Sequence, residues 1–263
     1  MKKLSLFLIV SLLVIGCKKD NSETYTRAAK DSALGEQIIS EVLREVLVYI
    51  PNYVINQNYS GNDGLFITSS PEITESSYPK RISLNYGDGI DGDLLRKREG
   101  KIIVTINSGT VISENLHITF EDFKSEGTKI LGHINYNYNQ SNSGYDGELP
   151  SDGMSFINAN GTMKLYGIFS FSKNSTQGTV DLKDDIYNFT CNTNGIDFNQ
   201  TQFTYVSTSN HLIDFSCKNY IKSGRSNLKP NGKNIQTVDF GSQNCDKNAS
   251  ITTSEGTIKN FTF

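Results

Sequence analysis

The first strong hydrophobic pattern of the chain repeats every four residues. Between about residues 28 and 50, apolar residues recur in pairs and are followed by Ile50: Ile38/Ile39, Val42/Leu43 and Val46/Leu47. Charged residues fill the positions between them: Glu36, Glu41, Arg44 and Glu45. This spacing predicts an amphipathic helix that ends at Pro51. An isolated helix of this length is marginal in water, so we expect it to lie on a sheet; a lid or a membrane-surface helix is the alternative.

From Lys80 onward the hydrophobic period changes to two, which is typical of β-strands. Candidate strands cover 81–86, 101–106, 116–120, 128–138, 154–157, 162–171, 178–182, 186–191, 202–206, 212–228, 235–240, 249–253 and 257–263, and Leu65-Phe66-Ile67 is a further short one. Turn signals lie between several of them: Asn160-Gly161, Asn194-Gly195, Asn231-Gly232 and Glu255-Gly256. We therefore expect an all-β fold, mainly an antiparallel meander in the form of a sandwich or a strongly curved half-barrel sheet, with one N-terminal amphipathic helix covering a face.

The N-terminus has the features of a lipoprotein signal peptide. Lys2 and Lys3 precede the uncharged stretch 4–15, and Val14-Ile15-Gly16 leads into Cys17 as in a bacterial lipobox. A dozen residues are too few for a comfortable transmembrane helix. We expect residues 1–16 to be removed, Cys17 to be lipidated (palmitate), residues 17–27 to form a tether, and 28–263 to form one β-rich domain. A buried thiol or an ordinary transmembrane anchor is the alternative.

Composition supports an exported protein. Removal of residues 1–16 leaves 247 of the 263 residues, with 23 basic and 28 acidic side chains, so nucleic acid is not an expected partner. Three cysteines remain after Cys17: Cys191, Cys217 and Cys245. One disulfide and one thiol is the simplest arrangement, with Cys217–Cys245 as the preferred pair; three reduced, buried cysteines are the alternative.

Several segments together resemble a family of uncharacterised outer-membrane lipoproteins from Bacteroidota. They are Tyr78-Pro79-Lys80-x-Ile82-x-Leu84-Asn85-Tyr86-Gly87, Arg98-x-Gly100-Lys101, Asp184-Asp185-x-Tyr187, Cys217-x-x-Tyr220-Ile221-x-Ser223-Gly224 and the most specific block, Asp239-Phe240-Gly241-x-x-x-Cys245-Asp246. The resemblance implies an all-β lipoprotein and brings no activity, substrate or catalytic residue. The chain departs from the family pattern where relatives often have a Cys after the first aromatic-Gly, because Asp88-Gly89-Ile90-Asp91 stands there. Lys18-Lys19-Asp20 resembles the signal for the outer leaflet, so the cell surface is preferred to the periplasmic face as the location.

No motif of the chain predicts catalysis. Asp88, Asp91 and Asp93 offer hard oxygen donors for Ca²⁺, but their order fits no defined calcium loop, and a solvated turn is preferred. His117, His133 and His211 belong to no ligand-spaced pair, so no metal, cofactor or enzyme activity is expected. The pairs Tyr136/Tyr138 and Phe169/Phe171 could stack on sugars, although core packing is the preferred interpretation.

Three functional hypotheses follow from these observations. The first is non-catalytic binding of a glycan or a protein ligand, by a protein attached to the membrane through Cys17. The second is a carrier whose curved sheet encloses an apolar ligand. The third is a hydrolase whose groups converge from distant strands. The sequence determines neither the ligand nor the oligomeric state.

Overall fold

The computed structural model describes residues 25–56, 65–70, 77–91, 94–108, 115–174, 181–242 and 244–263. The helical elements are α1 (Thr26–Asn56) and the short 3₁₀ helix η2 (Leu182–Asp184). The strands are β1 (Phe66–Ser70), β2 (Lys80–Asn85), β3 (Ile90–Asp91), β4 (Lys97–Ile106), β5 (Leu116–Ser125), β6 (Thr128–Leu131), β7 (His133–Asn139), β8 (Gly144–Asn158), β9 (Gly161–Lys173), β10 (Ile186–Ile196), β11 (Gln202–Ser207), β12 (His211–Asp214), β13 (Ile221–Pro230), β14 (Gln236–Ser242), β15 (Asn248–Thr252) and β16 (Ile258–Thr262).

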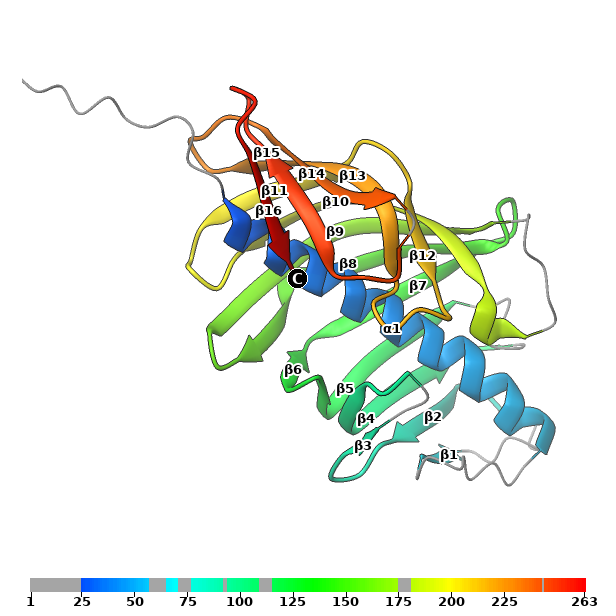
Figure 1. Ribbon diagram of the computed structural model, residues 1–263. Coiled ribbons are helices and arrows are strands. Elements are labelled where there is room, and N and C mark those ends of the chain that lie inside the picture. The colour runs from blue at the N-terminus through cyan, green and yellow to red at the C-terminus, as the bar shows by residue number, and fades with distance from the viewer. Residues whose placement is uncertain are drawn as a thin grey trace, which may run out of the picture.

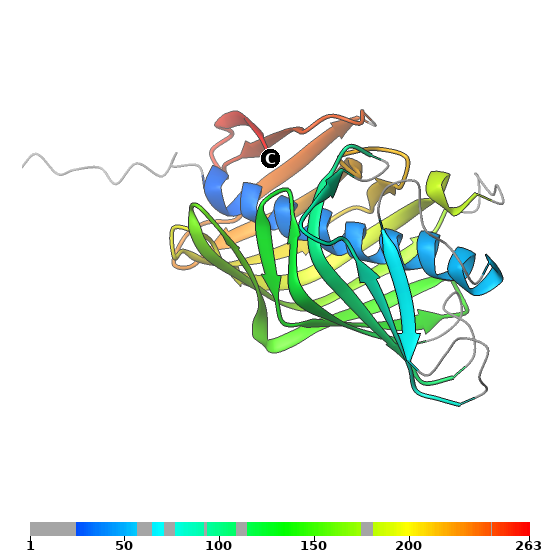
Figure 2. The ribbon, with the colours of Figure 1, turned by 90° about the horizontal axis from the view of Figure 1, so that it is seen from below.

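The described strands form one 16-stranded antiparallel sheet in which most neighbours in space are neighbours in sequence. The main path runs β1-β2-β4-β5-β6-β8-β9-β10-β11-β13-β14-β15-β16, and β3, β7 and β12 pair beside it. The expected all-β meander with one N-terminal helix is therefore confirmed, in the strongly curved form. Figures 1 and 2 show the sheet curving around α1, which crosses its concave side.

The helix is longer than the sequence predicted. It continues through Pro51 to Asn56, so the expectation that Pro51 ends it is wrong. A proline inside a helix removes one backbone hydrogen bond and crowds the preceding turn, at a cost of about 3 kcal/mol. The turn before Pro51 is fully packed, with Leu47, Val48, Tyr49 and Ile50 all buried. This burial offsets the cost of the proline. Among the described helices, none combines the length and apolar character needed to cross a membrane.

Between Ala28 and Ile50 the helix is almost entirely buried, which its amphipathic pattern did not predict. The apolar stripe is covered, as at Val42 and Val46, which are both 0% exposed. The polar positions are equally covered, and Glu41 and Glu45 are also 0% exposed. A helix on a flat sheet would present its charged side to water. The curvature of the sheet encloses that side too.

The inner face of the sheet follows the expected alternation. Aromatic rings from adjacent strands pack there in mutual contact: Tyr136, Tyr145, Phe169, Phe171 and Phe189. Because these five side chains are buried, core packing is the role that the structure gives to the aromatic pairs. Tyr138 is partly buried and packs on the ring of Tyr145.

One predicted turn is wrong. Asn194-Gly195 lies inside β10, and the chain turns at residues 197–200, where the amide of Gln200 donates to the carbonyl oxygen of Asp197. A Cβ atom at Gly195 would collide with the side chains of Phe203 and Leu165. The glycine is therefore explained by close packing within a strand. The signals at Asn160-Gly161, Asn231-Gly232 and Glu255-Gly256 do lie between consecutive strands.

Gly35 marks a close approach of α1 to the sheet. A Cβ atom at this position would overlap with Cδ1 of Leu165 on β9. Alanine is favoured over glycine by about 1 kcal/mol within a helix, whereas overpacking of a core costs about 1–3 kcal/mol. We expect Gly35→Ala to lower the free energy of unfolding, measured by urea titration. In a double-mutant cycle, Leu165→Ala should remove the overlap. The loss of unfolding free energy in the double variant should therefore be smaller than the sum of the losses in the two single variants. A Gly35→Ala protein that is more stable than the wild type would contradict this packing.

Candidate functional site

Glu41 of α1 lies at the centre of a buried ionic cluster. Its Oε1 accepts a hydrogen bond from Nε of Arg98 at 2.6 Å, and its Oε2 accepts one from Nη2 of Arg96 at 2.9 Å. The hydroxyl of Ser125 on β5 also donates to Oε2. Arg96, Lys97 and Arg98 alternate between buried, exposed and buried, so the period of an extended chain turns both arginines toward the helix.

Glu45, one helical turn later, extends the cluster. Its Oε1 lies 3.0 Å from Nη1 of Arg44 and 3.1 Å from Nη2 of Arg98, and its Oε2 accepts a hydrogen bond of 2.8 Å from the hydroxyl of Tyr86. Arg44 also donates through Nε to the carbonyl oxygen of Phe215. The cluster therefore connects one stretch of helix to segments that are far apart in the sequence.

The cluster changes the protonation behaviour of its members. Burial by itself would raise the pKa of Glu41, but the charges of Arg96 and Arg98 and the hydrogen bonds to Glu41 outweigh burial and lower that pKa from 4.5 to about 2. Burial, together with the charge of Glu45, raises the pKa of Tyr86 well above its usual value. Glu41 therefore stays ionised and Tyr86 stays protonated at neutral pH.

A second buried cluster joins Glu36, His211 and Ser226. Nδ1 of His211 lies 2.6 Å from Oε1 of Glu36, and Nε2 lies 2.8 Å from the hydroxyl oxygen of Ser226. This order of carboxylate, imidazole and hydroxyl is that of a hydrolase triad. All three residues are buried, however, with exposed fractions of 3%, 0% and 0%. In this arrangement the contacts tie α1 to β12 and β13, and a substrate has no open path to the hydroxyl.

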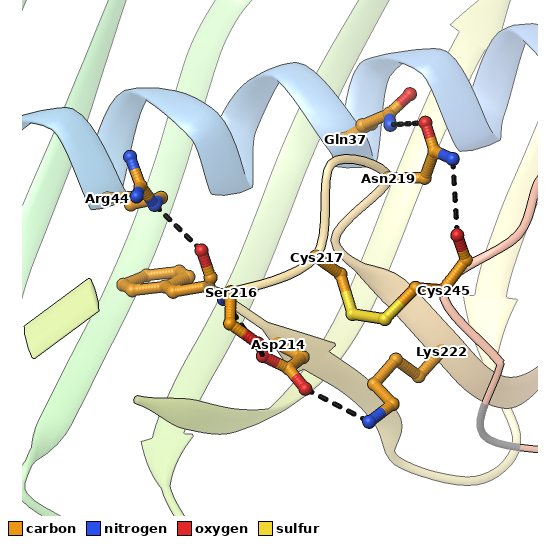
Figure 3. Close-up of a disulfide and its surroundings, with 9 residues drawn as sticks. Gln37, Arg44, Asp214, Ser216, Cys217, Asn219, Lys222 and Cys245 are labelled. Atoms are coloured by element: carbon orange, nitrogen blue, oxygen red, sulfur yellow. Dashed lines mark hydrogen bonds and ion pairs between the residues drawn. A yellow bond between two sulfur atoms is a disulfide. The ribbon is translucent and has the colours of Figure 1, made fainter. Parts of the chain in front are cut away.

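The disulfide joins Cys217 and Cys245, the pair preferred from the sequence, with Cα atoms 5.4 Å apart. Figure 3 shows it beneath α1, beside a chain of hydrogen bonds in which Gln37 donates to Asn219 and Asn219 donates to the carbonyl oxygen of Cys245.

Cys191 is the free cysteine of the described residues; it is buried, and burial raises its pKa to about 12. A thiol with such a raised pKa is a poor nucleophile.

The outer face of the sheet carries a depression of about 360 Å³ across β7, β8, β9 and β10. Its side chains are mainly polar: Asn137, Asp146, Glu148, Ser170, Thr190 and Asn192, with Ile168 as an exposed apolar contact. Asp146 is held in place, since Oδ1 accepts from the Ser170 hydroxyl at 2.7 Å and Oδ2 accepts from Nδ2 of Asn139 at 2.8 Å.

A second depression, of about 400 Å³, continues along the same face. Its lining includes Tyr166, Asn194, Gln202, Thr204, Lys229 and Asn231. The register of β9 and β10 connects the two, because Asn192 pairs with Ile168 and Asn194 pairs with Tyr166, two residues further along each strand. We call the two depressions together the outer groove. No sequence pattern predicts the outer groove, because its residues are scattered over β7 to β13.

None of the remaining candidate residues that the structure describes belongs to the lining of the outer groove. Cys17 and Asp93 lie outside the described residues. Asp88 and Asp91 are exposed near β3, and the calcium hypothesis stays a prediction. The three histidines separate into the buried His211 and a pair on the outer face, where the rings of His117 and His133 have centroids 5.2 Å apart. Within the described residues, Asp214, Cys217 and Cys245 are close enough together for a metal ion, but the disulfide occupies both sulfur atoms.

Comparison of the chain with family models, curated proteins and solved structures finds no match.

The ionic cluster makes stability depend on pH in a defined direction. Because the pKa of Glu41 is lowered to about 2 in the folded protein, its contribution is present above about pH 4.5 and is lost as the pH falls toward 2. That contribution amounts to about 3 kcal/mol for this shift. We expect Glu41→Gln to lower the free energy of unfolding at pH 7 by about 3–5 kcal/mol, because it leaves buried arginines with one carboxylate fewer. We also expect the stability of this variant to fall less steeply than that of the wild type as the pH is lowered below 4.5.

Urea unfolding at pH 7, 4.5 and 3 measures both effects. The matched control is Glu121→Gln on β5, which removes an exposed carboxylate from its pairs with Arg81 and Lys101 and should cost less than about 1 kcal/mol. Equal stability of Glu41→Gln and the wild type at pH 7 would show that the cluster does not hold the helix.

Proposed function

We propose that the protein is a non-catalytic glycan-binding lipoprotein of the cell envelope, attached through Cys17, and that the outer groove is its binding site. The observation that carries the proposal is the row of polar side chains that line two neighbouring depressions on the outer face of β7 to β13. The cell surface is the preferred location, and the periplasmic face is the alternative.

The chemistry of the groove suits sugar hydroxyl groups. Carboxamides such as Asn192 and Asn194 offer both donors and acceptors, and the carboxylates of Asp146 and Glu148 offer acceptors. Asp146 is already oriented by two hydrogen bonds, so less order has to be imposed when a ligand binds. Tyr166 and Ile168 add surfaces against which a sugar ring can pack. An elongated ligand with many hydroxyl groups fits this arrangement better than an apolar one.

The inner face of the sheet gives little support to the other two hypotheses, an apolar-ligand carrier and a hydrolase. A carrier needs an apolar cavity within the curved sheet. In the described structure α1 occupies the concave side and brings the ionic cluster of Glu41 and Glu45 into it. A hydrolase needs an accessible nucleophile, and Ser226 is fully buried beside His211. The outer groove is therefore the better candidate for a ligand site.

A glycan-binding experiment tests the groove directly. We expect the purified full chain to bind members of a panel of neutral, amino and uronic-acid oligosaccharides, and the double variant Asn192→Ala/Asn194→Ala to bind them about tenfold or more weakly. Each lost hydrogen bond is worth about 0.5–1.5 kcal/mol, and 1.4 kcal/mol corresponds to a factor of ten.

The control for this experiment is Asn210→Ala, another exposed asparagine that lies outside the groove lining. It should bind the same oligosaccharides as tightly as the wild type. Undiminished binding by the double variant, or no binding of any oligosaccharide by the wild type, would refute the assignment of the groove to glycans.

Lipid attachment is tested separately. We expect metabolic labelling with a palmitate analogue in a bacterial host to mark the wild-type protein and the Cys191→Ala variant, but not the Cys17→Ala variant, because only Cys17 follows the lipobox sequence. Gel fluorescence measures the label. A wild-type protein without label, or a labelled Cys17→Ala protein, would contradict the anchor.

A further inference from the structure

His117 and His133 are brought together on the outer face by the register of two strands. Thr119 of β5 pairs with His133 of β7, and His117 pairs with Asn135, so the two histidines are diagonal neighbours. Their ring centroids lie 5.2 Å apart and the ring planes are tilted by 43°. His117 is exposed and His133 is half-buried, so the space beside the rings opens to solvent.

Asn135 determines which nitrogen of His117 is free. Its Oδ1 lies 2.7 Å from Nδ1 of the ring. A carboxamide oxygen only accepts hydrogen bonds, so Nδ1 is the donor in this contact, and in the neutral ring the lone pair lies on Nε2. Metal-binding histidines are typically held in this way, with the second ring nitrogen donating to a fixed acceptor.

The ring separation is compatible with a single ion shared by the two histidines. With metal–nitrogen distances of about 2.0–2.1 Å, two imidazoles on a tetrahedral ion have centroids roughly 5 Å apart, and neighbouring imidazoles in a square arrangement roughly 4.5 Å apart. The observed 5.2 Å agrees with the tetrahedral case. Zn²⁺ prefers this geometry and accepts imidazole nitrogen, whereas Cu²⁺ prefers a square arrangement.

We propose that His117 and His133 bind a divalent transition-metal ion of tetrahedral preference, with Zn²⁺ as the best fit and Asn135 as the residue that positions His117. Two coordination positions stay open to water or to an oxygen atom of another ligand. Asn135 also pairs with Glu148, which lines the outer groove, so the ion would lie at the edge of that groove.

Direct metal binding by the purified, metal-free full chain tests this site without reference to glycans. Titration calorimetry with Zn²⁺ at pH 7.5 should show one site, and Co²⁺ should give the intense visible absorption of a tetrahedral complex. His117→Gln and His133→Gln should each weaken Zn²⁺ binding at least tenfold and abolish the Co²⁺ spectrum. Asn135→Ala should weaken binding about tenfold while the spectrum persists, since loss of an outer partner typically costs 10–100-fold in affinity.

All three substitutions are on the outer face, so the far-ultraviolet circular dichroism spectrum and the melting temperature of the metal-free variants should match those of the wild type. Cys191→Ser is the control for binding by the thiol and should bind Zn²⁺ as the wild type does. Wild-type protein that binds neither ion, or histidine variants with unchanged Zn²⁺ affinity, would overturn the proposal.

Discussion

The enclosure of a charged helix by a single curved sheet is the constraint on which the rest of the structure depends. Once α1 is covered on all sides, every ionised side chain on it needs a partner, because an unpaired buried charge costs several kcal/mol. Glu41 finds Arg96 and Arg98, Glu45 finds Tyr86, and Glu36 finds His211. Because these partners come from segments in or next to β2, β4 and β12, they restrict both the axial position and the rotation of the helix.

This constraint separates the two faces of the sheet by role. The concave face is filled by α1 and by aromatic side chains, so its residues serve packing and pairing. The convex face does not pack against the helix. Solvent is therefore accessible to polar residues there, such as Asn192 and Asp146, and to the pair of His117 and His133.

Several residues of the motifs noted in the sequence surround the charged side chains of the helix. Tyr86 donates to Glu45, and the guanidinium of Arg98 pairs with Glu41. Arg96 stacks over Tyr220 at 5.6 Å from the ring centroid, and Cys217 anchors the same loop through the disulfide. Tyr86, Arg98, Tyr220 and Cys217 are thus part of the inner lining that receives the helix, and none of them lines the outer groove.

The hydrophobic period of the sequence determined the class of this fold: a four-residue repeat for one helix, then a two-residue repeat for a long antiparallel meander. The number and position of the cysteines separately indicated the pair Cys217 and Cys245. Local pattern could not show that the sheet curves far enough to bury Glu41 and Glu45, nor that Gly195 serves packing and that the helix passes Pro51. Strand register brought Asn192 beside Ile168 and His117 beside His133, and the packing of α1 on the sheet brought Glu36 beside His211. Such contacts depend on pairing between distant segments, and that pairing is decided by the packing of the whole sheet around α1.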